Sequence, residues 1–463
     1  MVIIHILISL FLILISRKLF EKSFGVISIK EYMPHIHLWL LQLVIFCLVG
    51  SNLMVIGIRG YVISNFITNE ESYLYGLYSV YYVMIILPIS VIIFNYIFKF
   101  RIDKKLKVYL KKETNYYFID SDFFIKILFV VMSIVSILTV VYLCYYDAPL
   151  FMLLTGRINR VLTARITYSR AFHGSAIIKN IVGETLIPLS SYIAFAYYRF
   201  TKQKPWKNIF FILLVSSLFI RGASLAKSGI AFYLIPYIYI ITIMSRKIPY
   251  RKLVKIFLLV IPPLLMMYKV QYASSDLTIK DIVFDFYGGP LGRVFIVQIQ
   301  SLPSYFEIFP KSFDFLMGKS IALFRHLGLP FIESARVVAS FLEPVGVKEG
   351  WVGVANTLFV GDAYANFGLI GLIISPIWVA FVYSFFYWRL LSSPKTPLTI
   401  GYYVFILDNL TNSLTGGFFS AYVINTRVIV AMIFLFTIKL FVQIVGQKRN
   451  RFLNQVKSNK VIT

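Results

Sequence analysis

Long apolar runs separated by short polar links dominate this chain. Runs of about 17 to 25 apolar residues cross a bilayer as helices. They recur near residues 1–16, 38–58, 78–98, 124–146, 178–198, 207–222, 228–244, 253–270, 364–388, 398–418 and 424–445. This pattern predicts an all-α polytopic integral membrane protein with about eleven transmembrane helices. The run at 398–418 contains Asp408, Asn409 and Asn412, so ten or twelve spans remain alternatives. These residues, and Arg427 in the last run, are expected to line the helix bundle.

One link, residues 271–362, is far longer than the others. Five prolines divide it into short amphipathic pieces, at positions 290, 303, 310, 330 and 344. Because proline interrupts helices, we expect short helices at the membrane surface rather than one compact domain. The predicted organisation is a membrane domain at 1–270 with eight spans, the large loop at 271–362, a membrane domain at 363–446 with three spans, and a basic tail at 447–463.

The composition agrees with a membrane protein, since 59% of the 463 residues are hydrophobic and only 14% are charged. The net charge of +26 raises the question of a nucleic-acid partner. However, 28 of the 46 lysines and arginines fall in alternate links, whereas the large loop holds 7 basic and 9 acidic residues. Basic residues concentrate in cytoplasmic loops. The distribution therefore predicts an outside N-terminus and large loop, a cytoplasmic C-terminus, and no nucleic-acid partner.

The link at 147–177 breaks this charge rule, because it is predicted to lie outside and yet is rich in arginine. On one helix, Arg157, Arg160 and Arg165 would fall within about 140° of arc. The guanidinium fork matches pairs of phosphate oxygens and stays charged. A lipid-linked pyrophosphate would suit these arginines, and contact with anionic headgroups is the alternative.

A second pair of cations, Arg221 and Lys227, flanks a very short outer link. The small residues at 222–229 allow two helices to approach closely there. A cation in so tight a hairpin is poorly solvated, so we expect it either to bind an anion or to extend to the membrane surface.

The large loop and its exit hold further candidates. Arg293 follows a glycine-rich stretch at 288–292, and Arg325 precedes His326, which is able to act as a base or a hydrogen-bond donor. Asp362 is expected at a helix N-terminus, as a base or simply as a cap. The two cysteines, Cys47 and Cys144, lie in apolar runs and predict neither a disulfide nor a metal site. No nucleotide-binding loop is present in the sequence, which excludes an ATP-driven pump.

Two stretches resemble the O-antigen repeat-unit polymerases, the Wzy family. They are the motif Asp362-x-Tyr364-x-Asn366-Phe367-Gly368-x-x-Gly371 and the short outer turn at 222–229. The family motif often begins with Glu, where this chain has Asp362. The resemblance implies a GT-C-like glycosyltransferase of the bacterial inner membrane, related to O-antigen ligases. Such an enzyme passes a growing glycan from undecaprenyl pyrophosphate to the non-reducing end of a new lipid-linked repeat unit, at the periplasmic face.

With this resemblance, the candidate residues acquire expected roles and partners. The partners are the lipid-linked oligosaccharide, membrane lipids and a chain-length regulator protein, with no cofactor and no metal. An O-antigen ligase and a polysaccharide flippase or other transporter are the alternatives. The expected site residues are His326 and Asp362 for catalysis, Arg221, Lys227, Arg293 and Arg325 for pyrophosphate, and Arg157, Arg160, Arg165, Arg336, Tyr364 and Asn366 for glycan or carrier.

Overall fold

The protein is a bundle of long, near-parallel helices. The computed structural model describes residues 2–59, 66–67, 69–116, 121–157, 161–170, 172–245, 280, 283, 285, 289–349, 353–441 and 443. This part of the chain is all-helical and contains no sheet. Seven of its helices are long and apolar enough to cross a membrane, namely Ile3–Glu31, Pro34–Val55, Glu70–Ile97, Phe123–Tyr145, Ser228–Ser245, Val360–Ser392 and Phe419–Phe441. We therefore treat the protein as a multi-pass membrane protein.

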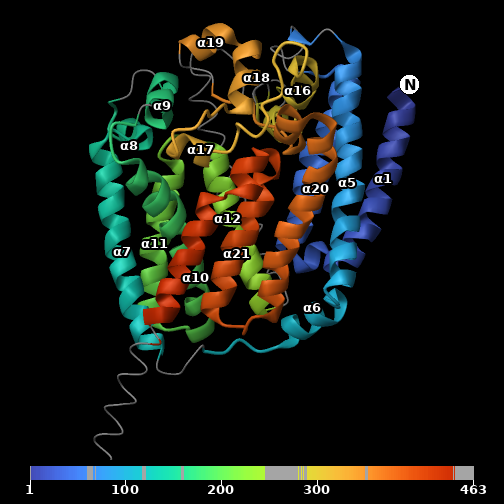
Figure 1. The fold of residues 1–463 in the computed structure, drawn as a ribbon. Helices are drawn as coiled ribbons and strands as arrows, with labels where there is room; N and C mark the ends of the chain where they lie inside the picture. The colour runs from blue at the N-terminus through green and yellow to red at the C-terminus, as the bar shows by residue number, and fades with distance from the viewer. Residues whose placement is uncertain are drawn as a thin grey trace, which may run out of the picture.

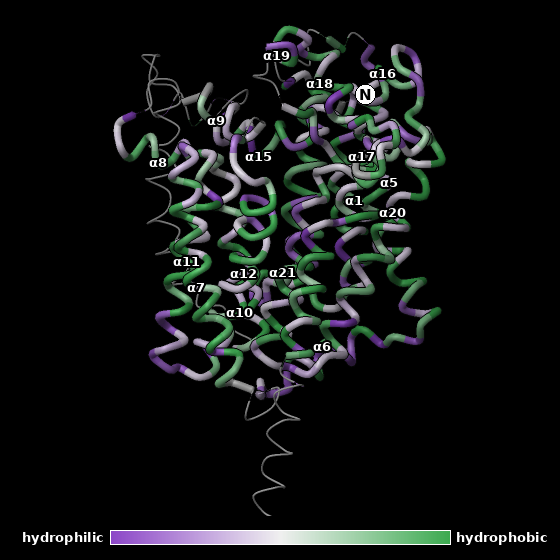
Figure 2. Tube along the Cα trace, turned by 60° about the vertical axis from the view of Figure 1, so that its left-hand side comes forward, coloured by the Kyte–Doolittle hydropathy of each residue, from purple (hydrophilic) through white to green (hydrophobic). Residues whose placement is uncertain are grey.

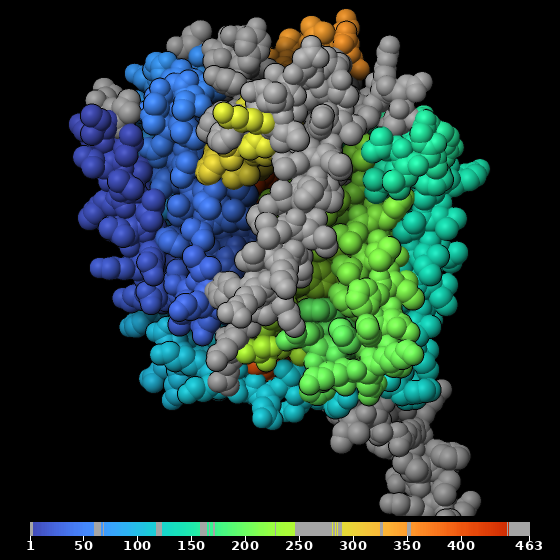
Figure 3. Space-filling view, turned by 180° about the vertical axis from the view of Figure 1, so that it is seen from behind, coloured from blue at the N-terminus to red at the C-terminus, as the bar shows by residue number. Residues whose placement is uncertain are grey.

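Neighbouring long helices form a continuous series across the bundle. Each packs against the next in the order α1 (Val2–Phe24), α5 (Glu70–Ile97), α20 (Val360–Ser392), α21 (Pro397–Asn412), α10 (Ile187–Thr201), α11 (Lys204–Gly222) and α7 (Ser121–Tyr145) (Figure 1). The N-terminal helices and the helices of residues 121–245 lie on opposite sides of the bundle (Figure 3). The C-terminal helices α20 and α21 join these two sides.

Seven of the eleven predicted spans coincide with the helices that are long and apolar enough to cross a membrane. The runs at 178–198, 207–222 and 398–418 are helical for most of their length but are not among these seven, and the span at 253–270 lies outside the described residues. The remaining elements of the bundle are α2 (Pro34–His37), η2 (Leu38–Val49), α3 (Gly50–Val55), η3 (Ile177–Leu186), α12 (Lys227–Ser245), η4 (Ser413–Thr415) and η5 (Phe419–Val423). The helix α1 continues past the predicted end at residue 16, to Phe24. Arg17 and Lys18 are part of this helix, beyond its apolar stretch, and their side chains are exposed.

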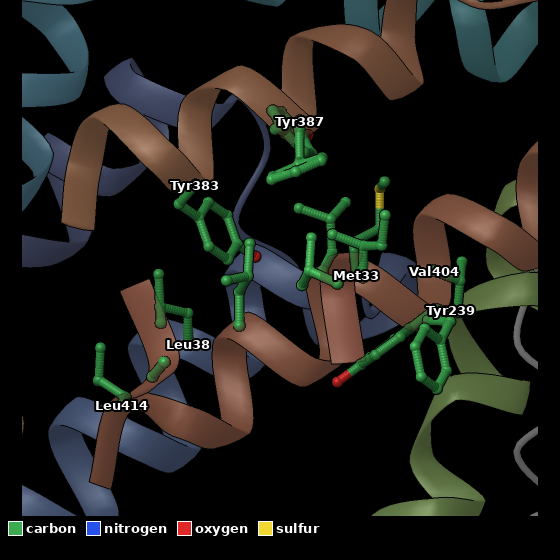
Figure 4. Close-up of a cluster of buried hydrophobic side chains, with 14 of the residues drawn as sticks. Met33, Leu38, Tyr239, Tyr383, Tyr387, Val404 and Leu414 are labelled. Carbon is green, nitrogen blue, oxygen red and sulfur yellow. The ribbon is translucent and has the colours of Figure 1, made fainter. Parts of the chain in front are cut away.

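The core of the bundle is built from aliphatic and tyrosine side chains of several helices. Figure 4 shows residues from four parts of the chain pointing toward one another. All are almost completely buried, among them Met33, Leu38, Tyr239, Tyr383, Tyr387, Val404 and Leu414. Between helices that lie in lipid, such side chains stabilise the bundle through close van der Waals packing and not by leaving water. This core therefore fixes the C-terminal helices against both the N-terminal helices and α12.

Short helices gather at one end of the bundle. They are α8 (Pro149–Leu154), α9 (Val161–Arg170), α15 (Pro290–Phe295), α16 (Leu302–Ile308), α17 (Leu323–His326), α18 (Ser334–Leu342) and α19 (Pro344–Lys348) (Figures 1 and 2). The amphipathic helix α6 (Ile102–Lys111) lies at the opposite end. Apolar residues follow the middle of the long helices, and polar residues concentrate toward the two ends (Figure 2). The large loop and the arginine-rich link thus share one end of the bundle.

The described part of the large loop is more compact than a set of separate surface helices. Tyr305, Ile308, Phe309, Leu316 and Val338 belong to a small hydrophobic core that also includes residues of α20. The prediction of short helices is confirmed for this part, but these helices bury apolar side chains against one another and do not lie as independent pieces. The helix α16 also packs against α5, which attaches the loop to the bundle.

Candidate functional site

A cavity of about 290 Å³ has residues of the short helix α9 in its wall. Figure 1 places α9 at the end of the bundle that carries the short helices. The cavity is lined by α9, η3 and the hairpin between α11 and α12, with the residues Tyr168, Ser169, Lys179, Asn180, Glu184, Ile220, Arg221, Ser224, Ala226, Ser228 and Gly229. Its wall includes one of the predicted cation positions, Arg221.

The hairpin between α11 and α12 is closed tightly by small residues. The helix α11 ends at Gly222 and α12 begins at Lys227. A Cβ added to Gly229 would lie only 2.7 Å from the backbone carbonyl oxygen of Arg221, so a side chain there would force the two helices apart. The close approach predicted for this hairpin is confirmed. It keeps the backbone of Arg221 in the cavity wall.

The arginine-rich link at 147–177 is hydrogen-bonded to this hairpin. The Nε of Arg165, in α9, donates to the carbonyl oxygen of Ser224 over 3.0 Å. The backbone N–H of Leu150, in α8, donates to the carbonyl of Ala223 over 3.0 Å. These bonds use carbonyl groups that the end of α11 leaves without helical partners. Burial, and then the positive charge of Arg293, lower the pKa of the Arg165 guanidinium.

Arg221 and Arg427 meet at Glu184. The Nη2 of Arg221 donates to the backbone carbonyl of Glu184 over 2.8 Å. The Nη2 of Arg427, from the last helix, pairs with Oε2 of the Glu184 carboxylate over 2.7 Å. The Nε of Arg221 is buried and has no hydrogen-bond partner among the described residues. One arginine therefore retains an unused donor beside the cavity.

Lys179 adds a further cation to the wall. Its Nζ donates to the carbonyl of Tyr168 over 2.6 Å and lies 4.2 Å and 4.7 Å from the ring centroids of Tyr168 and Phe172. Cation–π contacts stabilise a charge while leaving part of its shell available. Lys179, Arg221 and Arg427 thus lie around Glu184, whose carboxylate is the only one that lines the cavity among the described residues. Asp408 lies within electrostatic range of Arg221 but does not line the cavity. Such an excess of positive charge in a partly buried cavity favours an anionic ligand.

The other predicted cations outside this wall have local partners. Arg157 is exposed, pairs with Asp147 over 3.9 Å, and donates to Thr155 over 3.0 Å. It follows the end of α8, whereas Arg165 lies in α9. Arg157 and Arg165 therefore do not share one helix as predicted, because Arg157 lies in the non-helical residues that follow α8, and Arg160 lies outside the described residues. Arg336 is exposed on α18 and pairs with Glu333 over 3.6 Å.

Several predicted residues lie partly or wholly outside the described structure. Arg160 lies outside the described residues, and for Lys227, Arg325 and His326 only the backbone is described. Lys227 starts α12 at the cavity edge, and Arg325 and His326 end α17. Arg293 is exposed in α15, within electrostatic range of Arg165.

Asp362 and Asn366 form a joint between α20 and its neighbours, apart from the cavity wall. Oδ1 of Asp362 accepts from the Ser334 hydroxyl over 2.5 Å and from Nδ2 of Asn366 over 3.2 Å. Its Oδ2 accepts from the backbone N–H of Phe419 over 3.2 Å. Oδ1 of Asn366 accepts from the N–H of Gly318 over 3.1 Å. The joint therefore connects α18, the loop and the last helix to the start of α20.

The remaining residues of the exit motif shape a break in α20. Phe367 and Gly368 are non-helical, and Gly368 has a φ of 59°, which favours glycine. A Cβ at Gly371 would lie 2.1 Å from the carbonyl oxygen of Ala363. The Tyr364 ring packs against Phe306 and Phe315 of the loop, and its hydroxyl donates to the Phe309 carbonyl over 3.3 Å. The motif thus packs the small hydrophobic core of the large loop against the start of α20.

Sequence reasoning did not find Lys179 and Glu184, and it placed Arg427 only in the bundle lining. Residues 179 and 184 are five positions apart, which in an α-helix separates them by about 140°. They lie in the π-helix η3, where residues five apart are hydrogen-bonded neighbours, so both face the cavity. The sequence did contain one signal for this site, namely two charged residues near the start of the predicted span at 178–198.

Comparison with known proteins finds no matching family model, no matching curated protein and no matching solved structure.

Proposed function

We propose that this protein is a membrane glycosyltransferase that polymerises oligosaccharide repeat units carried on undecaprenyl pyrophosphate. The observation that supports this proposal most directly is the cavity wall, where Lys179 and Arg221, with Arg427 close by, outnumber the one carboxylate among the described lining residues, that of Glu184. Pyrophosphate is the leaving group of such a transfer, and its developing charge needs fixed cations more than it needs a general acid. In the proposal the cavity faces the periplasm of the bacterial inner membrane.

The surroundings of the cavity fit a lipid-linked glycan. The cavity lies at the end of the bundle, close to the long apolar helices, so a pyrophosphate can bind there while its lipid chain remains in the membrane. The large loop at the same end contains a second hollow of about 360 Å³, lined by Phe313, Phe315, Asp314 and Lys319 among others. Aromatic faces and exposed polar groups of this kind suit sugar rings.

Replacement of Arg221 tests the proposal in cells. Arg221→Ala removes the guanidinium in the cavity wall and is expected to shorten the surface polysaccharide toward single repeat units at normal protein level. Arg199→Ala is the matched control, because Arg199 also lies at a helix end and donates one hydrogen bond, to Ser245 over 2.7 Å. Long polymer in cells that carry Arg221→Ala at normal level would contradict the proposal.

A transporter is the second candidate, because charged residues lie inside predicted spans. Asp408 in α21 has an oxygen, Oδ1, that is buried and has no partner among the described residues. Charged groups within membrane helices often mark a substrate or ion pathway. The two functions differ in what loss of the gene leaves behind. A polymerase mutant displays single units on the outer face, whereas a flippase mutant retains them inside.

A further inference from the structure

Glu184 holds a special position in the cavity, because it contributes the only carboxylate among the described residues of the wall. Cations surround it. Arg427 holds its Oε2, and Lys179 lies within electrostatic range. A cavity that only binds an anion does not need a carboxylate in its wall, because the carboxylate would repel the ligand. Its presence therefore calls for a role besides binding.

The carboxylate of Glu184 is fixed in orientation. The 2.7 Å bond from Arg427 restrains Oε2, and the 2.8 Å bond from Arg221 restrains the backbone carbonyl of the same residue. No hydrogen bond to Oε1 is found among the described residues, and the side chain is 30% exposed. A lining carboxylate held in this way keeps Oε1 without a hydrogen-bond partner among the described residues, and its restrained position suits a catalytic group, which must not need to reorganise.

We propose that Glu184 is the general base of the transfer reaction, taking the proton from the sugar hydroxyl that attacks the donor. This inference rests on the proposed function. The hydroxyl proton moves to Oε1, and the oxygen's electron pair forms the bond to the anomeric carbon of the donor glycan. The bond between that carbon and the pyrophosphate oxygen breaks, and its electron pair leaves with the pyrophosphate. Glu184 then releases the proton to water.

In this proposal the cations of the wall hold the pyrophosphate and the carboxylate accepts the proton, so the two tasks belong to different side chains. Asp362 is differently placed, because both of its oxygens accept hydrogen bonds within the joint and it does not line the cavity.

Glu184→Gln tests the proposal in the full-length protein, purified into lipid nanodiscs and supplied with a lipid-linked oligosaccharide. The amide has the same shape but cannot accept the proton. We expect kcat to fall by about 10²- to 10⁴-fold with little change in KM. Inorganic pyrophosphate should bind as tightly as to the wild type or more tightly, since a negative charge has been removed. In Glu184→Ala, which leaves room for a small carboxylate, added formate should restore part of the turnover.

Glu70→Gln is the matched control, because Glu70 pairs with Arg59 over 2.8 Å and 2.5 Å outside the cavity. Its turnover is expected to equal that of the wild type. Unchanged turnover in Glu184→Gln would overturn the proposal and leave the proposed function standing. Loss of pyrophosphate binding together with turnover would also overturn it, by showing that Glu184 has a structural role.

The double variant Glu184→Arg, Arg427→Glu exchanges the two charged side chains. It keeps an ion pair between the two positions but moves the carboxylate to position 427. Full turnover in this double variant would also overturn the assignment of Glu184 as the base. A wild-type protein that makes no polymer would overturn both proposals.

Discussion

Arg221 is the residue on which the cavity depends most. It lines the wall, holds the backbone of Glu184 and keeps a buried Nε without a partner among the described residues. Hydrogen bonds from a charged donor contribute about 1.5–3 kcal/mol. An anion bound here should therefore lose much of its affinity when the guanidinium is removed, even though Lys179 remains.

We predict that Arg221→Ala weakens binding of inorganic pyrophosphate by about 10- to 100-fold, as measured by calorimetry on the protein in nanodiscs. Arg221→Lys should fall between the alanine variant and the wild type, because lysine keeps the charge and loses the planar fork. Arg199→Ala serves as the control at another helix end. Equal affinity in the wild type and Arg221→Ala would show that the cavity does not bind this anion through Arg221.

The sequence predicted some residues of this site and not others, for physical reasons. Arg165 stood out because positive charge in an outside link opposes the charge rule, and Arg221 stood out because it flanks a very short outer link. Lys179 and Glu184 did not, since their common face depends on a π-helix that no periodicity revealed. Arg427 pairs with Glu184 across 243 positions of sequence, a contact that only the packed bundle creates.

At the scale of elements, the start of α20 packs against the large loop. The helix breaks at Phe367 and Gly368, and the next turn approaches the first one closely. The small residue at position 371 permits this approach, because a Cβ there would lie 2.1 Å from the carbonyl oxygen of Ala363. Overpacking of this kind typically costs about 1–3 kcal/mol.

Gly371→Ala is accordingly predicted to lower the thermal unfolding temperature in nanodiscs. Gly76→Ala is the matched control in another long helix, since a Cβ there would make an ordinary contact of 3.4 Å with Pro303. We expect that control to unfold near the wild-type temperature. Similar unfolding temperatures for Gly371→Ala and the wild type would show that the backbone near the break in α20 accommodates a Cβ at position 371 without loss of stability.

The joint around Asp362 yields a second prediction at this scale. In Asp362→Asn, the amide NH₂ would replace an oxygen that accepts either from Ser334 or from the N–H of Phe419. A buried donor left unpaired costs about 1–3 kcal/mol. We therefore expect lower thermal stability and faster proteolysis of the large loop. Loss of glycan transfer with unchanged stability and proteolysis would instead indicate that Asp362 acts as the predicted base.

Hydropathy predicted the elements better than their ends. The described spans lie where the apolar runs do, yet α1 continues to Phe24 and α20 begins at Val360. The break in α20 could not be predicted, because the left-handed conformation of Gly368 is packed against the Phe315 ring of the distant loop. Asp362 was recognised as a helix-start residue, whereas its bonds to Ser334 and Phe419 depend on tertiary structure.

At the scale of the whole molecule, the alternation of links agrees with the arrangement of the helices. The arginine-rich link and the large loop lie at one end of the bundle, and the basic helix α6 lies at the other (Figure 1). The charge rule further predicts which end faces the cytoplasm.

Cysteine labelling tests this orientation. Lys311 is exposed on the large loop and Lys104 is exposed on α6. A membrane-impermeant maleimide should label Lys311→Cys in cells with a permeabilised outer membrane, and Lys104→Cys only after the inner membrane is opened. The native Cys47 is buried and Cys144 is half-buried, so the unsubstituted protein provides the background. The opposite labelling pattern would reverse the topology.

The central claim is that the cationic cavity transfers glycans from a pyrophosphate carrier. The most direct measurement supplies the purified protein in nanodiscs with a lipid-linked repeat unit and follows the length of the products. We predict dimers and longer glycans, with release of undecaprenyl pyrophosphate, and neither product with Arg221→Ala. Failure of the wild type to extend the units, or equal extension by Arg221→Ala, would contradict this account.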